Sequence, residues 1–160
     1  MKITSNNEDK RYMRYALNLA KRNLGNTGKN PSVGCVIVSK EKKIISAAST
    51  GLNGSPHAEK IAIEKSCEDI EGATVYVTLE PCLHNSINGS CSDQILRAGI
   101  KEIFISSTDP DKRTNGKSIK KFKLNKIVTN TGIQKKKTLE LNKFFFISLK
   151  TRKPYTKVKM

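Results

Sequence analysis

One histidine, one glutamate and two cysteines stand at positions where they could form a reactive site. Pro56-His57-Ala58-Glu59 precedes a short helical pattern, and Glu80-Pro81-Cys82 follows an apolar run at residues 73–79. That run alternates and is rich in β-branched residues, which predicts a strand. Cys91 opens a further helical pattern. We therefore expect one imidazole and two thiols to meet at one end of a sheet, with a carboxylate close to the imidazole.

This donor set is suited to zinc. Three protein ligands with an open fourth position are typical of catalytic zinc, whereas four protein ligands are typical of structural zinc. The zinc deaminase signature is His-x-Glu followed by Pro-Cys-x-x-Cys, and its glutamate is not a ligand. His57-x-Glu59 and Pro81-Cys82 match it, although eight residues separate Cys82 from Cys91. We therefore predict Zn²⁺ ligated by His57, Cys82 and Cys91, with Glu59 as the catalytic proton shuttle.

The other two cysteines are interpreted as structural. A buried cysteine usually behaves as a small hydrophobic residue. Cys35 lies in a predicted strand and Cys67 near a predicted helix end, so both fit that description. The same interpretation suits the His57, Cys82 and Cys91 set poorly, because the structural context of the motif is also met.

The length of 160 residues is sufficient for one domain with a substantial core. The first residues lack the apolar segment of a signal peptide, and no apolar run approaches membrane-spanning length. We therefore expect a cytoplasmic protein without a membrane partner. In a reducing compartment its four cysteines would be thiols or ligands rather than disulfides.

The net charge of +16 is unevenly distributed. Residues 1–100 carry 13 Lys and Arg against 10 Asp and Glu, whereas residues 101–160 carry 17 against 4. Such asymmetry can indicate nucleic-acid binding or anionic substrates. Lys outnumbers Arg 24 to 6, however, which indicates a coding bias that places lysine on every surface. We therefore favour a solvated surface over nucleic-acid binding.

The order of the predicted elements indicates an α/β protein. Apolar residues at three- and four-residue steps predict a helix over residues 8–24. Two strands follow, and then helices and strands alternate; this order implies a three-layer α/β/α sandwich with a mixed five-stranded sheet. Leu141, Phe144 and Phe145 of the last helix are expected in the core. The predicted strands are 34–38, 44–49, 73–79, 102–107 and 126–129, and the later helices are 57 onward, 91–99, 118–122 and 135–149.

These motifs resemble the cytidine-deaminase-like superfamily, and within it the deaminases of riboflavin biosynthesis. The resemblance covers nearly the whole chain, and the long spacing between the cysteines is its specific part. It is carried by the two zinc motifs and by Tyr12–Leu17, Asn30-Pro31-Ser32-Val33-Gly34-Cys35-Val36, Asp109-Pro110, Leu141-Asn142-Lys143-Phe144-Phe145 and Pro154-Tyr155.

The resemblance implies a cytidine-deaminase-like fold and hydrolytic, zinc-dependent deamination of diaminohydroxyphosphoribosylaminopyrimidine to the aminouracil ribosyl phosphate. Residues 1–150 would form the deaminase domain and residues 151–160 a basic C-terminal tail. The family's C-terminal reductase domain is not expected here, so a separate reductase would act in the pathway. Members of the family are commonly oligomeric, which leaves a homo-oligomer open.

By the same resemblance, Asn30 and His84 would bind the pyrimidine, although Asn30 before Pro31 is equally suited to a turn. The chain departs from the family in the loop at residues 85–90, where Ile87 replaces a basic residue; Thr50 also replaces a histidine. A ribosyl phosphate needs a cationic partner. Lys117 is our predicted substitute, with Lys29 as the other option.

Three alternatives remain open. The altered loop at residues 85–90 would suit a deaminase of another amino-pyrimidine or nucleoside. The positive charge would suit a deaminase of RNA, but the long cysteine spacing opposes it. A non-catalytic zinc-binding homologue is the third alternative, although a purely structural site has no use for Glu59.

Overall fold

The computed structural model describes residues 6–84 and 89–153. Ile87 and the greater part of the predicted tail, residues 154–160, therefore lie outside the described residues. Within the described ranges, no helix combines the length and the apolar character that crossing a membrane requires.

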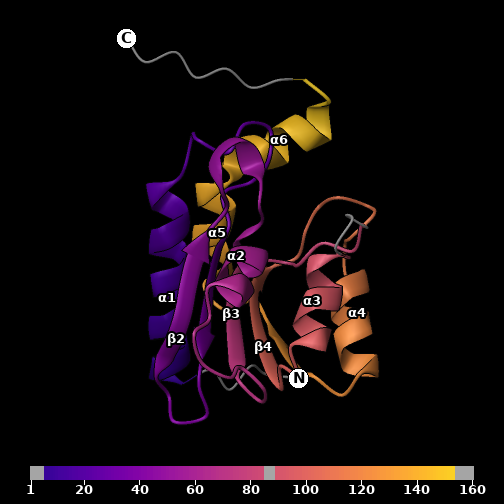
Figure 1. Ribbon diagram of the computed structural model, residues 1–160. Coiled ribbons are helices and arrows are strands. Elements are labelled where there is room, and N and C mark those ends of the chain that lie inside the picture. The colour runs from indigo at the N-terminus through magenta and orange to yellow at the C-terminus, as the bar shows by residue number, and fades with distance from the viewer. Residues whose placement is uncertain (1–5, 85–88, 154–160) are drawn as a thin grey trace.

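Five strands form a single sheet in the order β2-β1-β3-β4-β5 (Figure 1). β1 pairs antiparallel with β2 and β3, whereas β3, β4 and β5 are parallel to one another. The predicted mixed five-stranded sheet is thus confirmed, although the last strand begins two residues later than expected. The strands are β1 (Gly34–Val38), β2 (Ile44–Ser49), β3 (Thr74–Leu79), β4 (Glu102–Ser107) and β5 (Val128–Thr131).

Helices cover both faces of this sheet, so the molecule has the three predicted layers (Figure 1). The first face is covered by α1 (Asn7–Arg22) and α5 (Lys135–Leu141). The opposite face is covered by α2 (Ala58–Glu64), α3 (Cys91–Arg97) and α4 (Lys117–Leu124). A 3-10 turn, η1 (Leu52–Gly54), precedes α2, and α6 (Lys143–Thr151) extends past the end of the sheet where β3 and β4 finish.

Alternation along the strands produces two apolar cores. Cys35, Ile37 and their neighbours in β3 and β4 pack under α2, α3 and α4, whereas Val36 and Val38 pack under α1. On the α1 face, Tyr76 donates a hydrogen bond of 2.7 Å to Asp9 Oδ1. A Cβ at Gly34 would lie 1.9 Å from a carbonyl oxygen of α1, so the close packing of β1 on this helix requires glycine.

The C-terminal helix differs from its prediction, because it is broken into α5 and α6 at Asn142. The Asn142 side chain accepts a hydrogen bond of 2.9 Å from Ser32 N and donates one of 3.0 Å to Ser32 O. Asn142 is buried, so its amide satisfies backbone groups of a distant loop that water cannot reach. The break lets α6 run in its own direction beyond the sheet (Figure 1).

Burial also departs from expectation at several side chains. Cys35 is buried as predicted, but the prediction for Cys67 is wrong: this thiol is exposed, because it follows the end of α2. Leu141, Phe144 and Phe145 are half-buried rather than fully enclosed. Of these, Leu141 and Phe145 pack against the margins of the two cores.

Candidate active site

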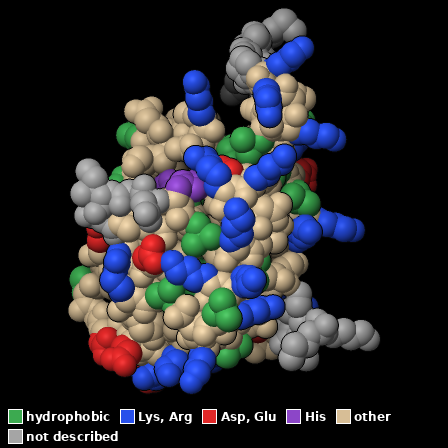
Figure 2. Space-filling model, turned by 90° about the vertical axis from the view of Figure 1, so that its right-hand side faces the viewer, with side chains coloured by type: hydrophobic (Ala, Val, Ile, Leu, Met, Phe, Trp, Pro, Cys, Tyr) green, Lys and Arg blue, Asp and Glu red, His purple; other side chains and the backbone are tan. Residues whose placement is uncertain are grey.

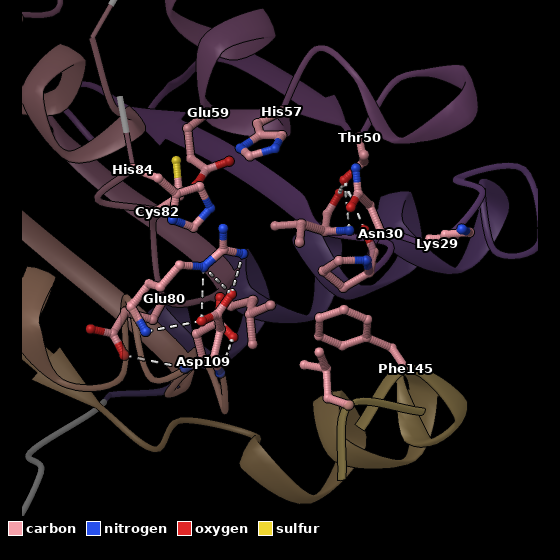
Figure 3. Close-up of a pocket in the computed structure, with 16 residues that line it drawn as sticks. Lys29, Asn30, Thr50, His57, Glu59, Glu80, Cys82, His84, Asp109 and Phe145 are labelled. Atoms are coloured by element: carbon pink, nitrogen blue, oxygen red, sulfur yellow. Dashed lines mark hydrogen bonds and ion pairs between the residues drawn. The ribbon is translucent and has the colours of Figure 1, made fainter. Parts of the chain in front are cut away.

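The first half of the site is built at the start of α2. His57 is the N-cap residue of this helix and has extended backbone angles, so the chain turns into the helix directly after the imidazole. Glu59 lies in the first helical turn and is 4 % exposed. Both side chains point into the same pocket, where Figure 3 shows them beside Cys82.

The second half joins the end of β3 to the start of α3. Cys82 follows β3, and Cys91 is the first residue of α3. Ser90 and Asp93 form a capping box that fixes where this helix begins. Ser92 then donates two hydrogen bonds to the carbonyl oxygen of Cys82, 3.2 Å from its backbone nitrogen and 2.8 Å from its hydroxyl. The two cysteines are therefore held together by backbone contacts as well as by their side chains.

The predicted ligands converge. One ligand atom each of His57, Cys82 and Cys91 lies within 4.8 Å of the others. His57 Nδ1 is 3.2 Å from Cys91 Sγ, and the backbone nitrogen of Cys91 donates to Cys82 Sγ at 3.4 Å. Both thiols are free rather than joined in a disulfide. Tetrahedral zinc with ligand bonds of about 2.0–2.3 Å needs ligand atoms in this range, so the set of one nitrogen and two sulfurs fits the metal.

The electrostatics of the cluster favour a cation. A hydrogen bond from Cys91 lowers the pKa of the Cys82 thiol, and the same contact raises the pKa of Cys91. A hydrogen bond to Cys82 raises the pKa of His57 to about 8. Negative charge is therefore favoured on the sulfur of Cys82, where it would attract a divalent metal.

Glu59 has the properties of a proton carrier. Burial raises the pKa of its carboxyl group to about 7. A general acid–base catalyst is most effective when its pKa lies near the working pH, so this value suits proton transfer near neutral pH. Its Oε2 atom is buried and, within the described part of the chain, has no hydrogen-bond partner. A buried polar atom without a partner indicates that a polar species normally lies beside it, as a substrate or water in a metal site would.

These side chains open into a pocket of about 190 Å³. Five of the predicted site residues line it, namely Asn30, His57, Glu59, Cys82 and His84. Cys91 is not a lining residue, but it belongs to the ligand cluster. Lys29 lies on its wall as well. Lys117 is different: its side chain is exposed at the first position of α4 and is not among the lining residues.

Asn30 and Thr50 have structural partners in the pocket wall. Asn30 Nδ2 donates to Gly54 O at 3.1 Å, so its side-chain oxygen remains available as an acceptor. Thr50, at the position where the family carries a histidine, accepts a hydrogen bond of 2.9 Å from Val33 N. Thr50 therefore joins the end of β2 to the start of β1, and the Asn30 amide is held in place for a ligand.

Several lining residues were not predicted as site residues. Parallel pairing sets Leu79 beside Ser107, so the segments that follow β3 and β4 must lie next to each other. The carboxyl ends of adjacent parallel strands are the usual place for a ligand, and that rule could have identified the second segment. No local pattern indicates the contribution of α6. These additional residues are Glu80, Asp109, Asp111 and Arg113 beyond the strands, and Phe145 and Leu149 on α6.

The chain was compared with known proteins. Residues 6–107 match the family described as the cytidine and deoxycytidylate deaminase zinc-binding region. The riboflavin biosynthesis protein RibD of Aquifex aeolicus is 40% identical over 151 residues, which are 94% of this chain and 42% of that protein. The chain therefore spans about two fifths of the length of such RibD relatives.

The chain is also similar to a relative of nearly the same length and to a solved structure. The diaminohydroxyphosphoribosylamino-pyrimidine deaminase of Buchnera aphidicola subsp. Schizaphis graminum is 37% identical over 92% of this chain and 99% of its own length. The crystal structure of the diaminohydroxyphosphoribosylaminopyrimidine deaminase/5-amino-6-(5-phosphoribosylamino)uracil reductase of Thermotoga maritima has a TM-score of 0.87. It is 34% identical and covers 92% of this chain and 43% of that chain.

Proposed function

Because this chain belongs to the cytidine and deoxycytidylate deaminase zinc-binding family, we propose that it deaminates diaminohydroxyphosphoribosylaminopyrimidine. The observation that carries the proposal is the convergence of His57, Cys82 and Cys91 beside a buried carboxylate oxygen of Glu59 that has no hydrogen-bond partner among the described residues. The similarity to a Buchnera deaminase over almost its whole length supports this choice of substrate.

The reaction would replace the exocyclic amino group of the pyrimidine by oxygen: a C–O bond forms from water, the C–N bond breaks, and ammonia leaves. When bound by His57, Cys82 and Cys91, zinc would act as a Lewis acid and make a water molecule acidic enough to yield hydroxide near neutral pH. Glu59 would accept the proton released by that water and give it to the ring nitrogen, and would then carry the remaining hydroxyl proton to the departing amine, which leaves as ammonia.

The pocket wall would orient the ring. The open side-chain oxygen of Asn30 can accept a hydrogen bond from an amino or imino group of the pyrimidine, and His84 can contact it from another side. Phe145 supplies an apolar surface on α6, opposite the ligand cluster in Figure 3. A planar, polar ring would thus have one apolar and two polar neighbours, which is the usual composition of a small-molecule site.

The product would be an aminouracil ribosyl phosphate, and we propose that a reductase like the one named for the Thermotoga protein consumes it. The face of the molecule shown in Figure 2 gives little support to a nucleic-acid substrate. Figure 2 shows Lys and Arg side chains spread over the face in view rather than gathered into one patch. Four free thiols are consistent with a reducing cytoplasm, which is our proposed compartment.

The experiment is to measure ammonia release from diaminohydroxyphosphoribosylaminopyrimidine by the zinc-loaded protein, alongside Glu59→Gln. We expect turnover by the native chain and a loss of about 100-fold or more in kcat in the variant, at equal zinc content, because general acid–base catalysis contributes about 10²–10⁴-fold. Near-full turnover in the variant would contradict the role of Glu59. If the native chain releases no ammonia from this compound, the substrate assignment is wrong, and a panel of other amino-pyrimidines and nucleosides would be tested.

A further inference from the structure

The pocket contains a cation that the sequence motifs did not indicate. Arg113 lies on the segment between β4 and α4 and lines the pocket, whereas its neighbours Lys112 and Lys117 do not. We propose that Arg113 binds the phosphate of the substrate and so replaces the basic residue that is lost at Ile87. This inference rests on the proposed function, and it names the residue that selects a phosphorylated substrate.

The segment that carries Arg113 is held in place by hydrogen bonds to the buried side chain of Glu80. Glu80 is 3 % exposed, and its carboxylate accepts four hydrogen bonds from this segment and the first turn of α4. Oε2 accepts from the backbone nitrogens of Asp109 at 3.2 Å and Gly116 at 2.9 Å. Oε1 accepts from the backbone nitrogen and hydroxyl of Ser118, at 3.2 and 2.7 Å. The backbone on both sides of Arg113 is therefore fixed to the residue that precedes Pro81-Cys82, so its position relative to the ligand cluster is well defined.

The guanidinium group is also held in place before any ligand binds. Asp111 accepts hydrogen bonds from Arg113 Nε at 2.9 Å and from Nη2 at 2.5 Å. Within the described residues, Nη1 makes no hydrogen bond, so its donors are available. The Arg113 side chain is 69% exposed at the pocket mouth, whereas Asp111 is 18% exposed. An arginine fixed in this way presents a rigid pair of donors, a geometry that suits phosphate oxygens.

Arg113 lines the same pocket as His84, the histidine that precedes the altered loop. Hydrogen bonds from Arg113 lower the pKa of Asp111 to about 2, and Asp111 lines the pocket together with Arg113 and His84. In the family that the chain resembles, the lost basic residue follows the histidine at the position of His84 by three residues. Arg113 therefore supplies a cation to the pocket that His84 lines, in a chain that has lost the basic residue three positions after this histidine.

Lys29 is the competing cation. It lines the pocket, but in the view of Figure 3 it lies beyond Asn30, on the side away from His84 and Cys82. A lysine ammonium is also a flexible point charge without the two-pronged geometry of arginine. Position and chemistry both favour Arg113 over Lys29.

The test compares the zinc-loaded native chain with Arg113→Gln, Arg113→Lys, Lys29→Gln and Lys112→Gln. Each is assayed for ammonia release from diaminohydroxyphosphoribosylaminopyrimidine and from the same compound after phosphatase treatment. We expect Arg113→Gln to raise KM for the phosphorylated compound about 10- to 100-fold, the effect of losing a hydrogen bond to a charged group. KM for the dephosphorylated compound should not change, Arg113→Lys should restore part of the loss, and Lys112→Gln should match the native chain.

Three results would overturn the proposal. Equal KM values for Arg113→Gln and the native chain would show that Arg113 does not bind the phosphate. A tenfold rise confined to Lys29→Gln would assign the phosphate to that lysine instead. An equal rise in KM for both compounds in Arg113→Gln would mean that the variant disturbs the site as a whole. Because the Arg113 side chain is mostly exposed, the melting temperature of the variant should stay within about 1–2 °C of the native value. A native chain inactive on both compounds would instead refute the proposed function itself.

Discussion

Replacing Glu80 by glutamine removes one negative charge from a buried carboxylate that joins two segments of the site. The glutamate is buried, and both of its oxygen atoms accept two hydrogen bonds from the segment between Asp109 and Ser118. Glutamine has nearly the same shape, but one of its two terminal atoms is a donor. The substitution therefore tests the hydrogen bonds without creating a cavity.

The size of the effect follows from the donors that lose a partner. If the new amide nitrogen faces Ser118, the hydroxyl can rotate to accept from it, but the Ser118 backbone N–H is left without an acceptor. If it faces the other way, the backbone N–H groups of Asp109 and Gly116 both lose theirs. An unpaired buried donor costs about 1–3 kcal/mol, and the remaining bonds lose their charge-assisted strength. We expect Glu80→Gln to lower the free energy of unfolding by about 3 kcal/mol, or roughly 6–12 °C in melting temperature for a chain of this size.

The assay is thermal and urea unfolding of the zinc-loaded protein at pH 7, with zinc content measured on each sample. Glu140→Gln is the matched control, because Glu140 is exposed on α5 and the same change there should shift stability by less than about 0.5 kcal/mol. A melting temperature for Glu80→Gln equal to that of the control would refute the reasoning. It would mean that the four contacts contribute no net stability and do not anchor the segment that carries Arg113.

Two further changes test the packing of the C-terminal helices and the metal set. Asn142→Leu should lower the free energy of unfolding by about 2–4 kcal/mol, because the buried N–H and C=O groups of Ser32 would both lose their partner; urea unfolding that overlays the native curve would contradict this. Cys91→Ser should reduce bound zinc well below one equivalent and abolish turnover, whereas Cys67→Ser, which changes an exposed thiol outside the cluster, should retain both. Full zinc occupancy in Cys91→Ser would remove Cys91 from the ligand set.

The sequence was sufficient to identify the elements around the zinc cluster, because the signals there are local. The strands at residues 34–38, 44–49 and 102–107 have the predicted bounds. Cys91 was expected at the start of a helix, and α3 begins there, fixed by the capping box of Ser90 and Asp93. Alternation and capping act over a few residues, so they can be read without knowledge of the fold.

Other features depend on contacts that no local pattern records. The break between α5 and α6 at Asn142 is one. An asparagine alone does not predict where a helix ends, and the hydrogen bond that holds Asn142 here is made to Ser32, 110 positions earlier. Arg113 is another, since an exposed arginine in a polar loop looks like any solvated cation until the loop is placed. The sequence by itself determined which side chains could hold a metal and move a proton. Only the tertiary structure decided which cation stands at the pocket mouth, because that depends on the parallel pairing of β3 with β4 and on the buried carboxylate of Glu80 beneath it.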